Sequence, residues 1–253
     1  QIENGYVTIP SLKRDCSVPP EDGDYLVIEK LGRSSNHRPT LAFFTHGAND
    51  PCSHFVWAGA ASAAAEHDVN LVCFPGKPLR SPHGFEAQAN ILYDLVDPDA
   101  FDALVIWLAG LTLQVDLAEV QVFCERYRPL PIVTAGVRLP GFPGVTVDNY
   151  HGMRDVVTHL IETHGRSRVA FIRGPEFHQE ADDRYRAYRD ALSEHGLPFD
   201  PSLVVQGDFK ESCGPLAVRE LIDRRRVPFD ALVAASDNMA IGAMKALQAR
   251  GVR

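Results

Sequence analysis

Short apolar runs alternate with amphipathic segments along most of the chain. The runs have the length of strands, and the segments between them place apolar residues at helical spacing. Runs that are apolar on both faces are typical of parallel strands covered by helices, so the pattern predicts an α/β protein. Strands are predicted at 41–44, 70–74, 103–108, 131–135, 145–147, 169–172, 203–205 and 231–235, and helices at 55–67, 85–96, 117–127, 153–163, 182–195, 216–225 and 239–249.

The same pattern divides the chain into an irregular beginning and two α/β halves. Residues 1–39 contain paired prolines and an acidic run, and within them only 25–28 has the character of a strand. We therefore expect a lead-in or linker over 1–39, an N-terminal lobe over 40–148 and a C-terminal lobe over 149–253. One sheet of about nine parallel strands is the alternative, but two sheets with a cleft between them fit the length better. Ligands of such folds bind at the carboxyl ends of the strands.

The composition excludes several classes of protein. Of the 253 residues, 45% are hydrophobic and 23% are charged, which is typical of a globular chain and not of a disordered one. No apolar run is long enough to span a membrane. The net charge of −8 argues against a surface built to hold nucleic acid.

Cysteine spacing and the two ends of the sequence lead to further expectations. The five cysteines are scattered without a CxxC pair, so we expect a reducing compartment and no zinc or redox motif. The first residues show no signal-peptide pattern, which favours a cytoplasmic protein. Gly251 has the character of a helix C-cap very close to the last residue, so we expect the sequence to be a fragment.

The chain carries none of the common motifs of catalysis. It has no P-loop, no dinucleotide-binding glycine motif after a strand, no GxSxG elbow and no HExxH pair. His151 and His159 have no supporting ligand spacing, which favours solvated or capping side chains over metal ligands. The basic run at 224–226 is short and fits a solvated helix end better than a nucleic-acid patch. We therefore expect no enzyme, no metal and no cofactor.

Several segments of the C-terminal half form a recognisable series. They are VDNYHG at 147–152, HLIE at 159–162, RVAFIRGP at 168–175, RYRAY at 184–188, GLPFDP at 196–201, GDF at 207–209 and SDNMAIGA at 236–243. In this order and spacing they resemble the effector-binding core of LacI/GalR-type regulators, and 40–143 is similar in layout and more loosely in sequence. The resemblance implies the periplasmic binding protein type I fold, with two Rossmann-like lobes, a ligand cleft between them and a homodimer. The final strand and the return to the N-terminal lobe would be missing here.

The resemblance also implies ligand-binding residues in the C-terminal lobe. Arg184 matches the arginine that binds effector hydroxyls or a carboxylate, for which a forked guanidinium is well suited. A surface pair with Glu180 is the alternative. Asp237 matches a polar contact to sugar hydroxyls, and its alternative is a helix N-cap. Asp148 and Asn149 match a polar pair near the hinge, and a capping turn is compatible with that role.

The N-terminal lobe departs further from the family pattern. The 50–55 loop has Cys52 and Ser53 where aromatic residues are usual, so Phe55 is the expected ring there, with Trp57 as the other choice. Trp107 ends a strand and is either a stacking surface for a sugar or a core residue. His46 follows the first strand and is included among the expected ligand-binding residues. Gly136-Val137 replaces a common Asp-Arg pair, which puts any specific sugar in doubt.

Three functions remain after these observations. Prolines interrupt any helix-turn-helix in 1–39. With its acidic core and the segments at 85–88 and 123–131, the chain most resembles LacI-like sensor modules of bacterial signalling proteins. Our main expectation is a sensor that binds a small polar, sugar-like or nucleobase-like effector and signals by hinge closure to a histidine kinase or diguanylate cyclase. The alternatives are the effector domain of a LacI-type regulator whose helix-turn-helix lies outside this chain, and a periplasmic sugar-binding protein. Neither nucleic acid nor membrane is an expected partner of this chain.

Overall fold

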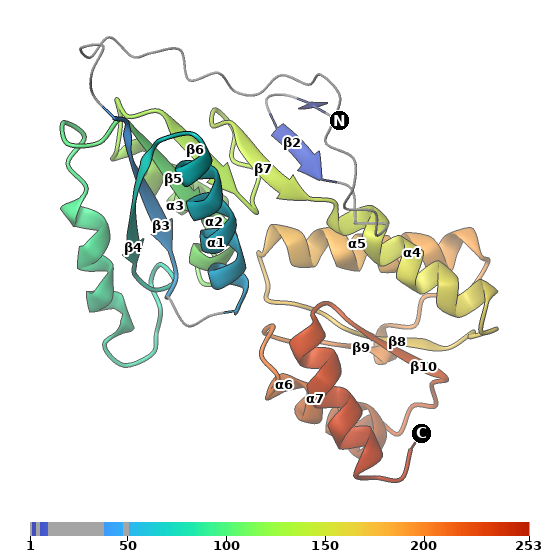
Figure 1. Cartoon of the computed structure of the whole chain (residues 1–253). Coiled ribbons are helices and arrows are strands. Elements are labelled where there is room, and N and C mark those ends of the chain that lie inside the picture. The colour runs from blue at the N-terminus through green and yellow to red at the C-terminus, as the bar shows by residue number, and fades with distance from the viewer. Residues whose placement is uncertain (1, 4–5, 10–37, 48–50, 253) are drawn as a thin grey trace. The chain divides into compact units, whose positions relative to one another are not determined.

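The computed structural model describes residues 2–3, 6–9, 38–47 and 51–252. The chain divides into two compact units, unit 1 (Gln1–Val147) and unit 2 (Asp148–Arg253). Each unit has its own sheet with helices packed against it (Figure 1). The predicted α/β class with two parallel-sheet lobes is therefore confirmed, and each unit is described separately below.

Unit 1 is built on a seven-stranded sheet with the order β1-β2-β7-β6-β5-β3-β4. All neighbouring strands run parallel except β1 and β2, which are antiparallel. In the central register Phe43 lies beside Cys73 on one side and Val105 on the other. The strands are β1 (Ile2–Glu3), β2 (Tyr6–Ile9), β3 (Thr40–Thr45), β4 (Asn70–Pro75), β5 (Ala103–Trp107), β6 (Ile132–Ala135) and β7 (Gly144–Val147).

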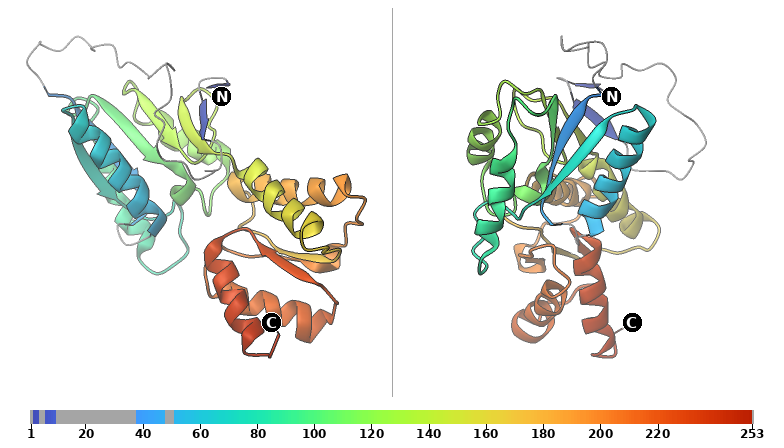
Figure 2. Two further views of the ribbon diagram at one scale, coloured as in Figure 1. Left: turned by 45° about the vertical axis from the view of Figure 1, so that its right-hand side comes forward. Right: turned by 60° about the vertical axis from the view of Figure 1, so that its left-hand side comes forward.

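Helices cover both faces of this sheet because successive residues of β3 point to opposite sides. Phe43 meets Trp57 of the first helix at 5.5 Å between ring centroids, so that helix covers one face. Phe44 meets Tyr93 at 4.7 Å and Phe123 at 6.1 Å, which places two other helices on the opposite, aromatic face. The helices are α1 (Pro51–Glu66), the 3₁₀ helix η1 (Glu86–Leu95), α2 (Leu108–Leu111) and α3 (Leu117–Glu125). Figure 2 shows α1 lying along one side of the sheet.

Unit 2 is built on three parallel strands in the order β10-β8-β9. On one face Phe171 stacks on Tyr188 at 4.6 Å between centroids, and α4 and α5 pack there against each other. On the other face lie α6 and α7 (Figure 1). The elements are α4 (Asn149–Glu162), β8 (Val169–Ile172), α5 (Gln179–Glu194), η2 (Pro201–Leu203), β9 (Val204–Val205), α6 (Cys213–Val218), the π-helix η3 (Arg219–Arg225), β10 (Ala231–Ala234) and α7 (Asp237–Gln248).

The structure corrects some details of the predicted elements. Residues 6–9 are not an irregular lead-in: they form β2, which pairs with β7 far along the chain. The segment at 85–96 is a 3₁₀ helix, and the segment at 216–225 begins earlier, at Cys213, and continues as a π-helix. Apolar spacing distinguishes a helix from a strand but does not resolve these helix types. The strand predicted at 25–28 lies outside the described residues.

Candidate functional site

The carboxyl ends of the three parallel strands of unit 2 form one edge of the sheet. Arg173 and Gly174 follow β8, Gln206 and Gly207 follow β9, and Ala235 follows β10. In parallel α/β sheets this is the edge at which ligands bind. A charged side chain from α5, the helix that follows the loop after β8, lies at this edge.

That side chain is Arg184, which is held by groups from two other elements. Its Nε and Nη2 donate to the Oδ1 of Asn149 at 2.8 and 2.5 Å, and its Nη1 donates to the carbonyl oxygen of Ala235 at 2.6 Å. Asn149 opens α4 and is only 8% exposed, whereas Ala235 directly follows β10. These hydrogen bonds fix the guanidinium at the sheet edge, and the Arg184 side chain is 23% exposed, so it remains partly accessible. The structure brings together two of the predicted residues, Arg184 and Asn149.

The predicted alternative for Arg184, a pair with Glu180, is also present. Arg184, Asn149 and Glu180 together form a polar group, which we call the Arg184 cluster. The Glu180 carboxylate lies 3.7 Å from Nη2 of Arg184, and its side chain is 13% exposed. This distance is longer than those of the hydrogen bonds to Asn149 and Ala235. The pair is therefore one side of a partly buried polar cluster and not an isolated contact on a solvated helix face.

Phe209 is a further residue of this cluster, and our sequence reasoning did not name it as a site residue. It lies in the loop after β9 with a φ of 68°, a left-handed conformation that is unfavourable for a residue with a bulky side chain. Its ring lies 5.7 Å from the guanidinium carbon of Arg184 and 5.1 Å from the ring of His178. The ring fits because residue 174 is glycine: a Cβ there would lie 2.3 Å from the Phe209 ring. The available signal was an aromatic residue in the GDF segment, directly after a strand end.

Asp148 and Asp237 take up helix-start positions. Asp148 is the N-cap of α4, where it accepts from the backbone N–H of His151 at 3.0 Å and also contacts the ring of His151. Asp237 is the exposed first residue of α7, and the N-cap is Ser236, whose Oγ accepts from the N–H of Met239 at 3.4 Å. The alternative of Asp237 as an N-cap is therefore wrong by one residue. The contacts described for Arg184 do not include either carboxylate.

The residues predicted in unit 1 are less closely grouped. His46 follows β3, its Nδ1 lies 3.1 Å from the Oγ of Ser53, and its ring occupies the space that a Cβ on Gly110 would take. Phe55 is 75% exposed on α1. Trp107 packs against the core of unit 1, which favours the core reading of that residue, while its buried Nε1 has no partner among the described residues.

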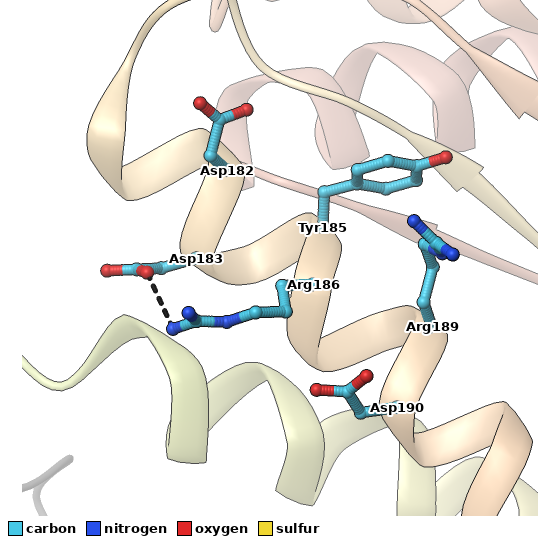
Figure 3. Close-up of a pocket in the computed structure, with 6 residues that line it drawn as sticks. All are labelled: Asp182, Asp183, Tyr185, Arg186, Arg189 and Asp190. Atoms are coloured by element: carbon cyan, nitrogen blue, oxygen red, sulfur yellow. Dashed lines mark hydrogen bonds and ion pairs between the residues drawn. The ribbon is translucent and has the colours of Figure 1, made fainter.

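A surface hollow on the outer side of α5 is separate from the Arg184 cluster. Figure 3 shows its lining residues, which include Asp183 and Arg186, joined by an ion pair of 2.9 Å. Arg184 is not among the residues that line it. Over residues 38–47 and 51–252, no group of three or more His, Cys, Asp or Glu side chains is placed to hold a metal ion. No helix among the described residues is long and apolar enough to cross a membrane.

Comparisons with known proteins identify the family. Residues 38–253 match the model of periplasmic binding proteins and the sugar-binding domain of the LacI family. The transcriptional regulator AscG of Escherichia coli is 30% identical over 194 residues, which are 76% of this chain and 54% of AscG. CelR of Thermobifida fusca, also a transcriptional regulator, is 42% identical over 109 residues, which are 43% of this chain and 32% of CelR.

A solved structure of a CelR–cellobiose complex is 30% identical, with a TM-score of 0.69 over 89% of this chain and 68% of that one. The chain thus spans about a third to a half of the length of these two curated relatives. The family predicted from the sequence segments is confirmed. The chain belongs to the family of periplasmic binding proteins and LacI-type sugar-binding domains.

Proposed function

We propose that this chain is the effector-binding domain of a LacI-type transcriptional regulator and that its effector is a small hydroxyl-bearing molecule of the sugar class. The observation that carries the proposal is the guanidinium of Arg184, fixed at the carboxyl edge of the sheet by Asn149 and the Ala235 carbonyl. A fixed guanidinium on a partly exposed side chain offers directed donors without a further entropic cost of ordering.

The surroundings of Arg184 support a sugar-class ligand. Sugars present hydroxyl groups that donate and accept, together with an apolar ring face. The Arg184 donors, the Glu180 carboxylate and the Phe209 ring supply the matching groups within one cluster. Ligand sites commonly combine a few placed polar groups with aromatic surface in this way. The solved CelR–cellobiose complex adds support from a relative.

The relatives favour the regulator over the kinase or cyclase sensor that the sequence alone led us to expect. AscG and CelR are both described as helix-turn-helix transcriptional regulators. Effector binding would act by favouring one conformational state of the regulator, and by no more than its difference in affinity between the states. The lobe boundaries at 148 and 149, the homodimer and the absence of DNA contact from this chain remain predictions.

The proposal is tested by thermal unfolding of the 253-residue chain in the presence of cellobiose and a panel of neutral sugars. At least one sugar is expected to raise the Tm saturably, and Arg184→Ala is expected to abolish that rise. Arg186→Ala is the matched control, because Arg186 lies on the same helix and its side chain contacts Asp183 and the ring of Tyr150, not the groups that hold Arg184. Arg184→Lys keeps the charge but loses the fork, so it is expected to fold and to bind weakly.

An unchanged sugar response in a folded Arg184→Ala or Arg184→Lys chain would contradict the assignment of Arg184. Far-UV circular dichroism and the Tm without ligand establish that each variant is folded. A panel that produces no rise in the wild-type chain would contradict the sugar-class effector.

A further inference from the structure

The donors of Arg184 are only partly used by the protein. A guanidinium has five N–H groups, and Asn149 and the Ala235 carbonyl accept from one each on Nε, Nη1 and Nη2. As far as the described residues go, one N–H on each terminal nitrogen is left. The Nη2 nitrogen is the one that lies 3.7 Å from Glu180.

Glu180 therefore places a carboxylate beside a terminal nitrogen that has an N–H not used by Asn149 or Ala235. Its side chain is 13% exposed and that of Arg184 is 23% exposed, so solvent screens the two charges less than it would on an open surface. The two residues are four apart on α5, which holds donor and acceptor on one helix face. The cluster offers a pair of adjacent groups, one that donates and one that accepts.

This pair discriminates between ligand chemistries. A hydroxyl group accepts from Arg184 and donates to Glu180 at the same time. A carboxylate or phosphate group only accepts, and its negative charge would lie against that of Glu180. Like charges placed together in a partly desolvated site oppose binding strongly.

We propose that Glu180 is a specificity-determining residue that makes the Arg184 cluster select neutral hydroxyl-bearing ligands and reject anionic ones. The inference rests on the proposed function, because it names the class of ligand that the same cluster takes. It also narrows the initial expectation that the arginine binds either hydroxyls or a carboxylate. Arg184 alone would attract anions, and Glu180 cancels that attraction where the ligand lies.

The test compares a neutral sugar with anions by isothermal titration calorimetry on the 253-residue chain. The probes are cellobiose, cellobionate, which is the carboxylate made by oxidising cellobiose, and inorganic phosphate. In Glu180→Gln the affinity for the two anions is expected to rise by roughly tenfold relative to the wild-type chain, while that for cellobiose does not rise. Glu180→Ser removes the same charge with less volume and is expected to give the same gain, so the test does not depend on one substitution.

Two further variants show where the gain arises. Glu194→Gln removes one negative charge from the far end of the same helix, where Glu194 pairs with Arg154 of α4, so it is expected to leave anion affinity unchanged. The double variant Glu180→Gln with Arg184→Ala is expected to lose the gain, because no guanidinium remains to hold the anion.

Three results would overturn the proposal: no gain in anion affinity in folded Glu180→Gln and Glu180→Ser, an equal gain in Glu194→Gln, or a gain that persists without Arg184. These results are read from the anion titrations alone. Failure of the proposed function is read instead from the neutral sugars, when none of them binds the wild-type chain.

Discussion

The guanidinium of Arg184 donates from two of its nitrogens to a single oxygen, the Oδ1 of Asn149. Asn149 is the first residue of α4, and Arg184 lies in the second turn of α5, so this contact joins two packed helices near their N-terminal ends. Asn149 is buried, and the contact is formed at the sheet edge where a ligand would bind. The orientation of Arg184 therefore depends on a residue of another element.

Asn149→Ala is expected to weaken ligand binding and to destabilise the chain. The substitution leaves the guanidinium of a mostly buried side chain without its main acceptor, and a hydrogen bond to a charged group contributes about 1.5–3 kcal/mol. We expect the free energy of unfolding, measured with urea, to fall by about 1–3 kcal/mol for that reason. Asn238→Ala, an exposed change in the first turn of α7, is the control and is expected to have little effect.

Replacing glycine by alanine is expected to change the free energy of unfolding in opposite directions at two positions. Gly59 lies within α1 with open space around it, so Gly59→Ala is expected to raise the free energy of unfolding by about 0.5–1 kcal/mol. Gly76 lies against Tyr93, and a Cβ there would lie 2.3 Å from the ring, so Gly76→Ala is expected to lower it. Urea unfolding of both variants measures the two signs, and equal signs would contradict the packing described around Gly76.

The apolar runs predicted most strands because the information they carry is local. Phe43, Phe44 and their neighbours form a continuous apolar run, and both faces of that run are indeed covered. β2 was not predicted, because its strand character depends on pairing with β7, a contact that a local pattern does not contain. Long-range pairing of this kind overrides the weak local preference of a short segment.

In the candidate site, too, the sequence indicated the residues but not the long-range contacts between them. Arg184 and Asn149 were named from the family resemblance, but the hydrogen bonds between them depend on how α4 and α5 pack. Phe209 was missed because its left-handed backbone turns the ring toward Arg184, and a sequence gives little sign of that in a residue other than glycine. The N-cap of α7 was misplaced by one residue because Ser236 and Asp237 are both good N-cap residues.

The contacts of His195 lead us to expect that the stability of the folded chain depends on pH. Its Nδ1 lies 2.7 Å from the carbonyl oxygen of Ala191 and its Nε2 lies 3.1 Å from the carboxylate of Glu162. Both neighbours are acceptors, so the ring satisfies both contacts only when both nitrogens are protonated. The hydrogen bond to the Ala191 carbonyl and then that to Glu162 raise the pKa of His195 above its ordinary value.

A raised pKa in the folded state means that this stabilisation is present at low pH and is lost as pH rises. It is complete below the ordinary histidine pKa of about 6.5 and disappears as pH passes through the higher pKa of the folded chain. His195→Gln is therefore expected to reduce the free energy of unfolding more at about pH 5.5–6, where the ring is protonated, than at about pH 8.5–9, where it is largely neutral. His67→Gln, on the exposed end beyond α1, is the control, and a pH-independent difference for His195→Gln would refute the protonated contact.

We expect removal of the Tyr93 hydroxyl to loosen the carboxyl edge of the unit 1 sheet locally. Its buried hydroxyl donates to the carbonyl oxygen of Thr45 at 2.9 Å and lies 3.3 Å from that of Lys77, so it joins the ends of β3 and β4. Tyr93→Phe keeps the ring in the aromatic core but leaves these buried carbonyl groups without that donor, which costs about 1–3 kcal/mol. Hydrogen exchange is expected to become faster around residues 45–47 and 76–78 than in the rest of the unit.

Tyr185→Phe removes the same atom from a partly exposed ring of unit 2 and should leave exchange at 45–47 unchanged. Uniform acceleration throughout unit 1 in Tyr93→Phe would show that the hydroxyl supports the whole core and not this edge in particular.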